Sequence, residues 1–159
     1  MRETEEKQND KIEAEQVLEA GQEAADEEPA DQFQRTRRLI GAEALQRLHD
    51  AKVLVFGVGG VGGYVCEALV RAGVGQIDIV DKDVVDITNL NRQIIATHDT
   101  VGQPKVEVCA ARMRSINPQV RVKPMQCFYL PEKASEFSFG DYDYIVDAID
   151  NVTAKIDLI

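Results

Sequence analysis

The segment Asp81–Gln93 holds the densest group of side chains that could bind or activate a ligand. Its carboxylates, amides and guanidinium can bind sugar hydroxyls, phosphate oxygens or a metal ion. The segment leaves the carboxyl end of a predicted strand, where open α/β sheets bind ligands. Aspartate and asparagine are also common in ordinary loops, so a plain loop is the alternative. The side chains concerned are Asp83, Asn89, Asn91, Arg92 and Gln93.

Two more charged residues stand at the ends of predicted elements. Lys105 lies in the first turn of a helix that opens at Gly102-Gln-Pro, where the helix dipole disfavours a cation, so we expect an anion beside it. Asp150 ends a predicted strand, and its hard oxygen ligands suit Mg²⁺. Asp150 can also cap a helix that we expect to begin at Asn151, and the two roles are compatible.

The stretch Val53–Gly62 supplies the first part of the scaffold for these residues. Four large apolar residues run into a glycine cluster, as in a buried parallel strand that ends in a turn. Gly57, Gly59 and Gly62 have the G-x-G-x-x-G spacing of a phosphate-binding turn before a helix. Asp81 follows about twenty residues later, where such folds place the acid that binds ribose. The pattern predicts a ribose-containing nucleotide, does not distinguish a dinucleotide from ATP, and leaves an ordinary glycine turn as the alternative.

Strands and helical patterns alternate along the chain. This order predicts an α/β fold: a Rossmann-like, doubly wound, mainly parallel sheet. Pro124 places the third strand at an edge or at an irregular end. The predicted strands are Val53–Phe56, Gln76–Asp81, Val120–Gln126 and Tyr144–Asp150, and the predicted helices are Gly63–Ala72, the segment from Gly102 to Ile116, and Glu132–Phe139.

The segment Phe33–Leu48 combines a basic patch with a short helical pattern. Arg35, Arg37 and Arg38 fit a solvated face. They fit equally well as groups that reach phosphates, because the guanidinium can bind such oxygens in a bidentate way.

The net charge of −10 belongs mainly to the beginning of the chain. Residues 1–31 hold twelve of the 28 acidic residues and three of the 18 basic ones, with few large aliphatic side chains. Such composition cannot offset the entropy cost of ordering, so we expect an acidic, disordered tail over residues 1–31 and a folded domain over residues 32–159. A partner-binding helix near Glu13–Glu19 is the alternative for the tail.

The three cysteines, Cys66, Cys109 and Cys127, form no C-x-x-C pair, and this excludes an evident zinc site or disulfide framework. Cys66 and Cys109 lie in helical patterns, which favours small buried side chains over reactive thiols. No long apolar run predicts a membrane span, and no signal sequence opens the chain, so we expect a cytoplasmic protein. The sequence stops inside an apolar helical pattern at Ile159, and we therefore expect a fragment.

Residues 36–159 resemble the N-terminal half of the ThiF/MoeB-type adenylating enzymes, which are related to ubiquitin-activating enzymes. Within that superfamily they are most similar to the tRNA threonylcarbamoyladenosine dehydratase branch. The segments that carry the resemblance are Thr36–Gly41, Val55–Gly62, Asn89–Gln93, Val101–Glu107, Ile116–Pro118 and Val146–Asp150.

The resemblance implies ATP-dependent, Mg²⁺-dependent adenylation of a carboxylate. In the dehydratase branch, the substrate carboxylate belongs to the threonylcarbamoyl group on a tRNA adenosine, and ring closure then displaces AMP with net loss of water. The working unit would be a homodimer. A full-length family member is longer, so this chain alone would be inactive or marginally stable.

The family motifs also imply residue roles. Arg92 and Lys105, with Asn89, would neutralise phosphate charge, and Asp150 would hold Mg²⁺. Arg38 resembles the arginine that family members insert into the neighbouring subunit's site. The remaining nucleotide-binding residues implied by the resemblance are Gly57, Gly59, Gly60, Gly62, Asp81, Asp83 and Gln93.

Three other functions stay open. A ubiquitin-like sulfur-carrier protein could be the partner in place of tRNA, and the near-neutral charge of residues 32–159 gives no basic face for RNA. An NAD-dependent oxidoreductase would share the glycine turn and Asp81. That function does not explain the polar segment Asn89–Gln93 or the lysine at position 105. A non-catalytic nucleotide-binding module is the third alternative.

Overall fold

The computed structural model describes residues 31–150, 153, 155 and 156. The chain divides into two compact units, residues 1–34 and residues 35–159. The predicted tail therefore lies outside the described residues except for Asp31, and the helix expected from Asn151 lies mostly outside them. The α-helices are α2 (Gln34–Ile40), α3 (Ala42–Asp50), α4 (Gly62–Ala72) and α5 (Lys105–Ile116).

The larger unit is built on one parallel sheet in the order β3-β2-β1-β4. In the paired register, Val53 lies opposite both Ile77 of β2 and Tyr144 of β4, while Phe56 lies opposite Val80 and Asp147. The predicted Rossmann-like, mainly parallel α/β fold is confirmed. The strands are β1 (Lys52–Phe56), β2 (Gln76–Val80), β3 (Pro124–Met125) and β4 (Tyr144–Asp147).

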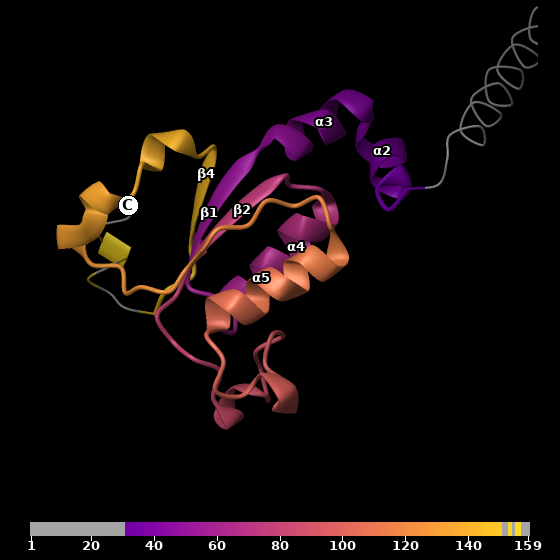
Figure 1. Ribbon diagram of the computed structural model, residues 1–159. Coiled ribbons are helices and arrows are strands. Elements are labelled where there is room, and N and C mark those ends of the chain that lie inside the picture. The colour runs from indigo at the N-terminus through magenta and orange to yellow at the C-terminus, as the bar shows by residue number, and fades with distance from the viewer. Residues whose placement is uncertain (1–30, 151–152, 154, 157–159) are drawn as a thin grey trace, which may run out of the picture. The chain divides into compact units, whose positions relative to one another are not determined.

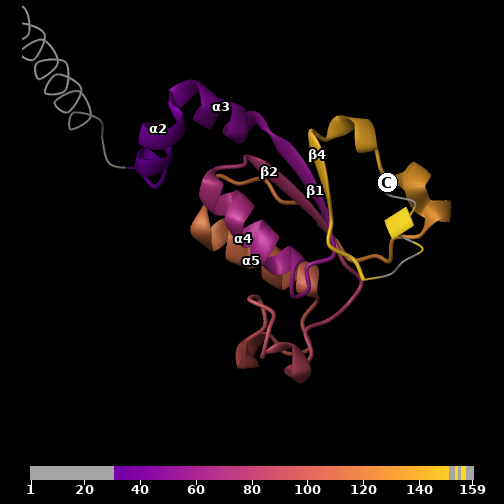
Figure 2. The same ribbon diagram turned by 180° about the vertical axis from the view of Figure 1, so that it is seen from behind.

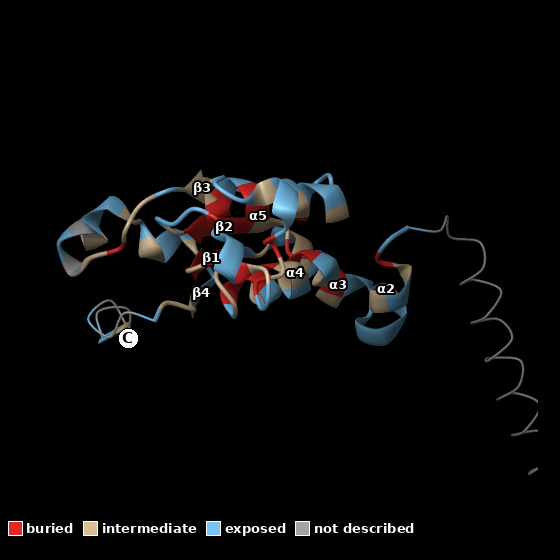
Figure 3. Ribbon diagram, turned by 90° about the horizontal axis from the view of Figure 1, so that it is seen from below, coloured by how far each residue is buried: buried red, intermediate tan, exposed pale blue. Residues whose placement is uncertain are grey.

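Helices α4 and α5 lie side by side on one face of the sheet (Figures 1 and 2). Alternate strand residues, such as Val55 and Ile79, turn to this face and pack against apolar residues of both helices. Buried residues concentrate between the strands and the two helices (Figure 3). This packed layer is the larger of the two hydrophobic cores and holds α4 and α5 against the sheet.

Cys66 of α4 and Cys109 of α5 belong to this core, and both thiols are free. Hydrogen bonding with Cys109, together with burial, raises the pKa of the Cys66 thiol. A thiol that stays protonated is a poor nucleophile, so the prediction of buried, unreactive side chains agrees with the packing.

The opposite face carries a smaller core of Leu54, Phe56, Val80 and Tyr129. Two 3₁₀ turns, Pro131–Glu136 and Phe139–Asp141, cover it in place of the predicted helix Glu132–Phe139. The predicted helix is therefore wrong: short turns bring Phe137 and Phe139 against the sheet in place of one regular helix.

Two strand predictions are also corrected. The third strand is reduced to Pro124–Met125, although Arg121 and Lys123 still accept backbone hydrogen bonds from β2 through their carbonyl oxygens. Its edge position, predicted from Pro124, is confirmed. The fourth strand ends at Asp147, three residues before the predicted end at Asp150.

The basic segment at the start of the domain forms two helices, α2 and α3, which part at Gly41 with a φ of 83°. Leu45 of α3 is buried, and Leu48 packs against the larger core. None of the helices in the described part of the chain is long and apolar enough to cross a membrane.

Candidate functional site

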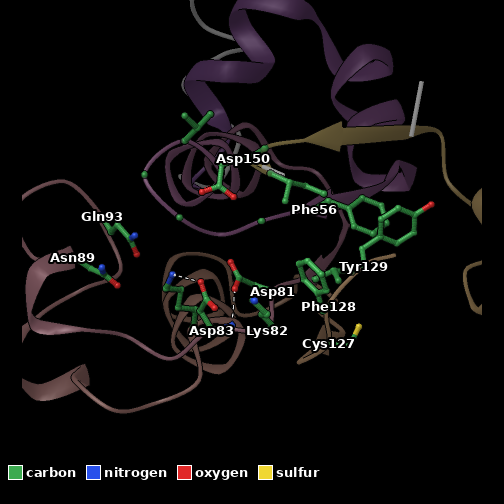
Figure 4. Close-up of a pocket in the computed structure, with 18 of the residues that line it drawn as sticks. Phe56, Asp81, Lys82, Asp83, Asn89, Gln93, Cys127, Phe128, Tyr129 and Asp150 are labelled. Carbon is green, nitrogen blue, oxygen red and sulfur yellow. Dashed lines mark hydrogen bonds and ion pairs between the residues drawn. The ribbon is translucent and has the colours of Figure 1, made fainter. Parts of the chain in front are cut away.

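A pocket of about 490 Å³ opens at the carboxyl edge of the sheet. It lies beyond β1 and β4, two adjacent strands at which the chain changes direction across the sheet, and β2 and β3 also send residues into it. Such a topological switch point is where open α/β sheets bind ligands. Figure 4 shows acidic, amide and aromatic side chains around this space. The polar and charged lining residues are Asp81, Lys82, Asp83, Asn89, Arg92, Gln93, Lys105 and Asp150.

The glycine turn forms the floor of the pocket through Gly57, Gly59 and Gly60. Gly57 has a φ of 85°, and a Cβ built there would lie 2.7 Å from the carbonyl oxygen of Ala148. Its N–H donates to the carbonyl of Val80 at 2.7 Å, which ties the turn to β2. Only glycine allows this conformation and this close approach.

Gly62 does not line the pocket, and its role as a nucleotide contact stays a prediction. A Cβ at Gly62 would overlap the carbonyl oxygen of Gly57. Gly62 therefore has the close-packing role of the third glycine in the fingerprint: it lets α4 begin directly against the end of β1.

Asp81 holds the turn in place from the end of β2. One carboxylate oxygen accepts the Val58 N–H at 2.9 Å, and the other accepts the Asp83 N–H at 2.8 Å. Asp81 therefore organises both the glycine turn and the following segment while it lines the pocket. A carboxylate oxygen can accept more than one hydrogen bond, so these contacts leave capacity for a ribose hydroxyl.

Lys105 is buried, with 6% of its surface exposed, at the first position of α5. Its Nζ lies 3.1 Å from Oδ2 of Asp83, whose side chain is half exposed. The expected anion beside Lys105 is therefore Asp83. A buried ammonium at the pocket wall is available to a phosphate that approaches the same space.

Asn89 and Gln93 are both 7% exposed and line the pocket. The Oδ1 of Asn89 accepts the Asp86 N–H at 3.1 Å in a capping box, which fixes the orientation of the amide. Hydrogen bonds from the hydroxyl and N–H of Thr88 hold the pKa of the Asp86 carboxyl below its ordinary value, so this cap stays ionised. The buried Oε1 of Gln93 has no hydrogen-bond partner among the described residues.

Arg92 is exposed at the pocket wall, and its Nη1 donates to the Thr88 carbonyl at 2.9 Å and to Asn91 Oδ1 at 3.0 Å. These contacts hold the Arg92 guanidinium against neighbouring residues of the same turn, Thr88 and Asn91. Arg38, by contrast, is an exposed residue of α2 and does not line the pocket of its own chain.

Asp150 lines the pocket from the loop after β4, and its carboxylate is exposed there (Figure 4). The described residues contain no group of three or more metal-binding side chains. A magnesium ion at Asp150 would therefore complete its oxygen shell with phosphate oxygens and water, as Mg²⁺ at nucleotide sites commonly does.

The sequence reasoning missed the apolar wall of the pocket. Phe56 and Tyr129 meet with ring centroids 4.7 Å apart, and the Nζ of Lys82 lies 4.4 Å from the ring centroid of Phe128. All four residues line the pocket, together with Cys127. The available signal was the Cys-Phe-Tyr sequence directly after the third predicted strand, at the ligand-binding edge.

The comparisons with known proteins agree with this geometry. The model of the ThiF family matches residues 33–159. The tRNA threonylcarbamoyladenosine dehydratase of Bacillus subtilis is 49% identical over 127 residues, or 80% of this chain and 50% of the relative. The sulfur carrier protein adenylyltransferase of Thermus thermophilus is 40% identical over 130 residues, or 80% of this chain and 48% of the relative.

Solved structures of a related enzyme are also similar to this chain. The E. coli tRNA N6-threonylcarbamoyladenosine dehydratase in complex with ATP has a TM-score of 0.78 and 46% identity, covering 80% of this chain and 53% of the relative. The same enzyme in complex with AMP also has a TM-score of 0.78. The chain spans about half the length of these relatives. Fold, glycine turn and family match together show that this chain belongs to the ThiF family.

Proposed function

We propose that the protein activates a carboxylate with ATP, and that the carboxylate is the threonylcarbamoyl group of a tRNA adenosine. One observation carries the proposal: a single pocket at the switch point gathers the glycine turn, Asp81, Lys105, Arg92 and Asp150 from four separate segments. The dehydratase relatives at 49% and 46% identity support the choice of substrate.

The residues suit the charge changes of adenylation. A substrate carboxylate oxygen would attack the α-phosphorus of ATP, forming a P–O bond to the acyl group as the bond to pyrophosphate breaks. Lys105 and Arg92 would stabilise the charge on the phosphate oxygens, with the Asn89 amide as a further donor. The glycine turn would lie against the phosphates, and Asp81 would accept hydrogen bonds from the ribose hydroxyls.

The acyl-adenylate would then react without a protein nucleophile. Attack by the carbamoyl group of the same substrate on the activated carbonyl would close a ring and release AMP. This second step needs no cysteine, which agrees with the burial of Cys66 and Cys109.

Mg²⁺ fits the donors present at this site. Asp150 offers an exposed carboxylate at the pocket, and the phosphates of ATP offer further hard oxygen ligands. A bound Mg²⁺ would neutralise phosphate charge and orient the leaving pyrophosphate.

The active assembly would be a homodimer in which Arg38 reaches the site of the partner. Support for this role is the exposure of Arg38 on α2 and its position outside its own pocket. Analytical ultracentrifugation tests the dimer. Mixing Arg38→Ala subunits with Arg92→Ala subunits should restore part of the activity if Arg38 acts in trans.

A second candidate is adenylation of the C-terminus of a sulfur-carrier protein. The sulfur carrier adenylyltransferase that is 40% identical to this chain favours it. The same pocket would bind ATP in both functions. The two candidates therefore differ only in the molecule whose carboxylate is adenylated.

ATP–pyrophosphate exchange tests the proposed function, with threonylcarbamoyladenosine-bearing tRNA or a sulfur-carrier protein as the only acceptor. Arg92→Ala and Asp150→Ala should each lower exchange by about two orders of magnitude. Arg47→Ala should leave it unchanged, because Arg47 is exposed and pairs with Glu43 outside the pocket. Full exchange in both pocket variants would contradict the proposal, and exchange with the carrier protein alone would select the second candidate.

A further inference from the structure

Asp150 lies on the loop after β4, between the two residues of an ion pair outside the pocket, Asp147 and Lys155. Strand β4 ends at Asp147, so Asp150 is not held by the ladder of the sheet. An exposed side chain three residues beyond a strand needs other contacts to keep a fixed place at a binding site. The structure supplies them through Asp147 and Lys155.

The two oxygens of the Asp147 carboxylate have different partners. Oδ1 accepts the Ile149 N–H at 3.1 Å, which closes a tight turn directly before Asp150. Oδ2 lies 2.7 Å from Nζ of Lys155, five positions after Asp150. The carboxylate therefore joins the chain before Asp150 to the chain after it.

The remaining contacts make this loop part of the pocket wall. The Ala148 N–H donates to the Phe56 carbonyl at 2.9 Å, and the carbonyl of Ala148 lies against Gly57. The loop is thus pressed against the glycine turn on one side. Asp147 and Lys155 hold its other side, with 25% and 40% of their side chains exposed.

We propose that Asp147 and Lys155 are positioning residues that keep the Asp150 carboxylate directed into the nucleotide pocket, and so set the affinity of the site for Mg²⁺ when ATP is bound. Neither residue lines the pocket, so neither would touch the nucleotide. The inference rests on the proposed function, because it assigns Mg²⁺ to Asp150. Outer partners that orient a metal ligand commonly change metal affinity tenfold or more when removed.

The test measures ATP binding to the full-length protein by calorimetry over a range of Mg²⁺ concentrations. Lys155→Met should raise the Mg²⁺ concentration for half-maximal ATP binding by about tenfold. Lys155→Arg, which keeps the charge, should stay close to the wild type. AMP binding without Mg²⁺ should be unchanged in both, which a general loss of structure would not allow.

Arg112→Met is the matched control. Arg112 is also 40% exposed and pairs with a carboxylate, Glu67, at 2.6 Å, but this pair joins α5 to α4 and not the two sides of Asp150. It should leave the Mg²⁺ dependence unchanged. An equal shift in Arg112→Met and Lys155→Met would show a general stability effect and would overturn the inference.

Asp150→Asn separates failure of the inference from failure of the proposed function. Loss of Mg²⁺ dependence in Asp150→Asn with no shift in Lys155→Met would overturn the positioning role alone. Unchanged Mg²⁺ dependence in Asp150→Asn would overturn the assignment of Mg²⁺ to Asp150, and with it the inference. Absence of ATP binding by the wild type at every Mg²⁺ concentration would contradict the proposed function itself.

Discussion

The two faces of the sheet are built by different means from the same strands. The face under α4 and α5 is aliphatic, with Val53, Val55, Ile77 and Ile79 against apolar helix residues. Its packing is regular because two helices with apolar stripes pack against parallel strands.

The other face is aromatic and irregular. Phe56 contacts Tyr129, Phe137 and Phe139, with ring centroids 4.7 to 6.2 Å apart. It also contains a buried carboxylate, Asp78, which accepts hydrogen bonds from the Tyr142 hydroxyl at 2.8 Å and from the Lys123 N–H at 3.1 Å.

Only the aromatic face contributes buried core residues to the pocket. Phe56, Val80 and Tyr129 belong to its core and line the pocket, whereas no buried member of the helix-side core does so among the described residues. The comparison teaches that both faces stabilise the sheet, while only the aromatic face also shapes the site. Substitutions on the two faces should therefore have separable effects.

Phe56→Ala should have the largest effect. Loss of this ring should lower the free energy of unfolding by about 3–5 kcal/mol and should also weaken ATP binding, because Phe56 is a pocket residue. Val55→Ala, one position away on the opposite face, should lower stability but leave ATP affinity unchanged. Urea denaturation measures the stability of the two variants, and calorimetry measures their ATP affinity. Equal losses of ATP affinity in both would contradict the proposed difference between the two faces.

Gly62→Ala should come next, with a loss of about 2–3 kcal/mol, because the new Cβ would overlap the Gly57 carbonyl under the pocket floor. Gly140→Ala is the control from the aromatic-face cover, where a Cβ meets no atom within 4 Å. Thermal unfolding should show a large change for the first variant and almost none for the second. A stable Gly62→Ala protein would refute the close-packing role.

Tyr142→Phe should cost about 1 kcal/mol, because Asp78 loses a hydrogen-bond donor at a half-buried site. Burial, followed by the hydrogen bond and charge of Asp78, raises the pKa of Tyr142 from 10.0 to about 12. A raised pKa stabilises the fold below pH 10, and this contribution is lost as the pH rises through 12. The difference in free energy of unfolding between the wild type and Tyr142→Phe should therefore shrink from pH 10 to pH 12, as urea denaturation at each pH can show. A difference that stays constant over this range would show that the contact with Asp78 does not cause it.

Arg112→Met should have the smallest effect on stability, at most about 1 kcal/mol, since its ion pair with Glu67 joins α4 and α5 at the surface. Burial alone would raise the pKa of Glu67, but hydrogen bonds from Arg112 and Arg71 outweigh it and hold the pKa below 4.5. The contribution is present above pH 4.5 and disappears as the pH falls further. Acid denaturation of the wild type and of Arg112→Met checks this prediction. A stability difference between them that grows as the pH falls would contradict it.

Local patterns were sufficient for the helix-side half of the molecule. The apolar run of β1, the spacing of Gly57, Gly59 and Gly62, and the helical pattern after Pro104 each depend on neighbours in sequence. The carboxyl-end rule for parallel strands then placed the Asp81–Gln93 segment and Asp150 at one edge before any contact was known.

The aromatic face could not be predicted in this way. Its cover, Pro131–Asp141, has no regular period, so its turns depend on where Phe56 and Asp78 offer contacts. The prediction that β4 extends to Asp150 failed because apolar residues continue past Asp147, and it is the partners of the Asp147 carboxylate that turn the chain there.

The sequence by itself determined the parallel sheet, the glycine turn and the identity of the charged residues, because each follows from periodicity, backbone freedom or chain direction. The tertiary structure alone decided which anion accompanies Lys105 and that Asp147 pairs with Lys155 across Asp150. Both pairings depend on how the chain folds and on how far each side chain reaches in three dimensions, and no local pattern encodes either.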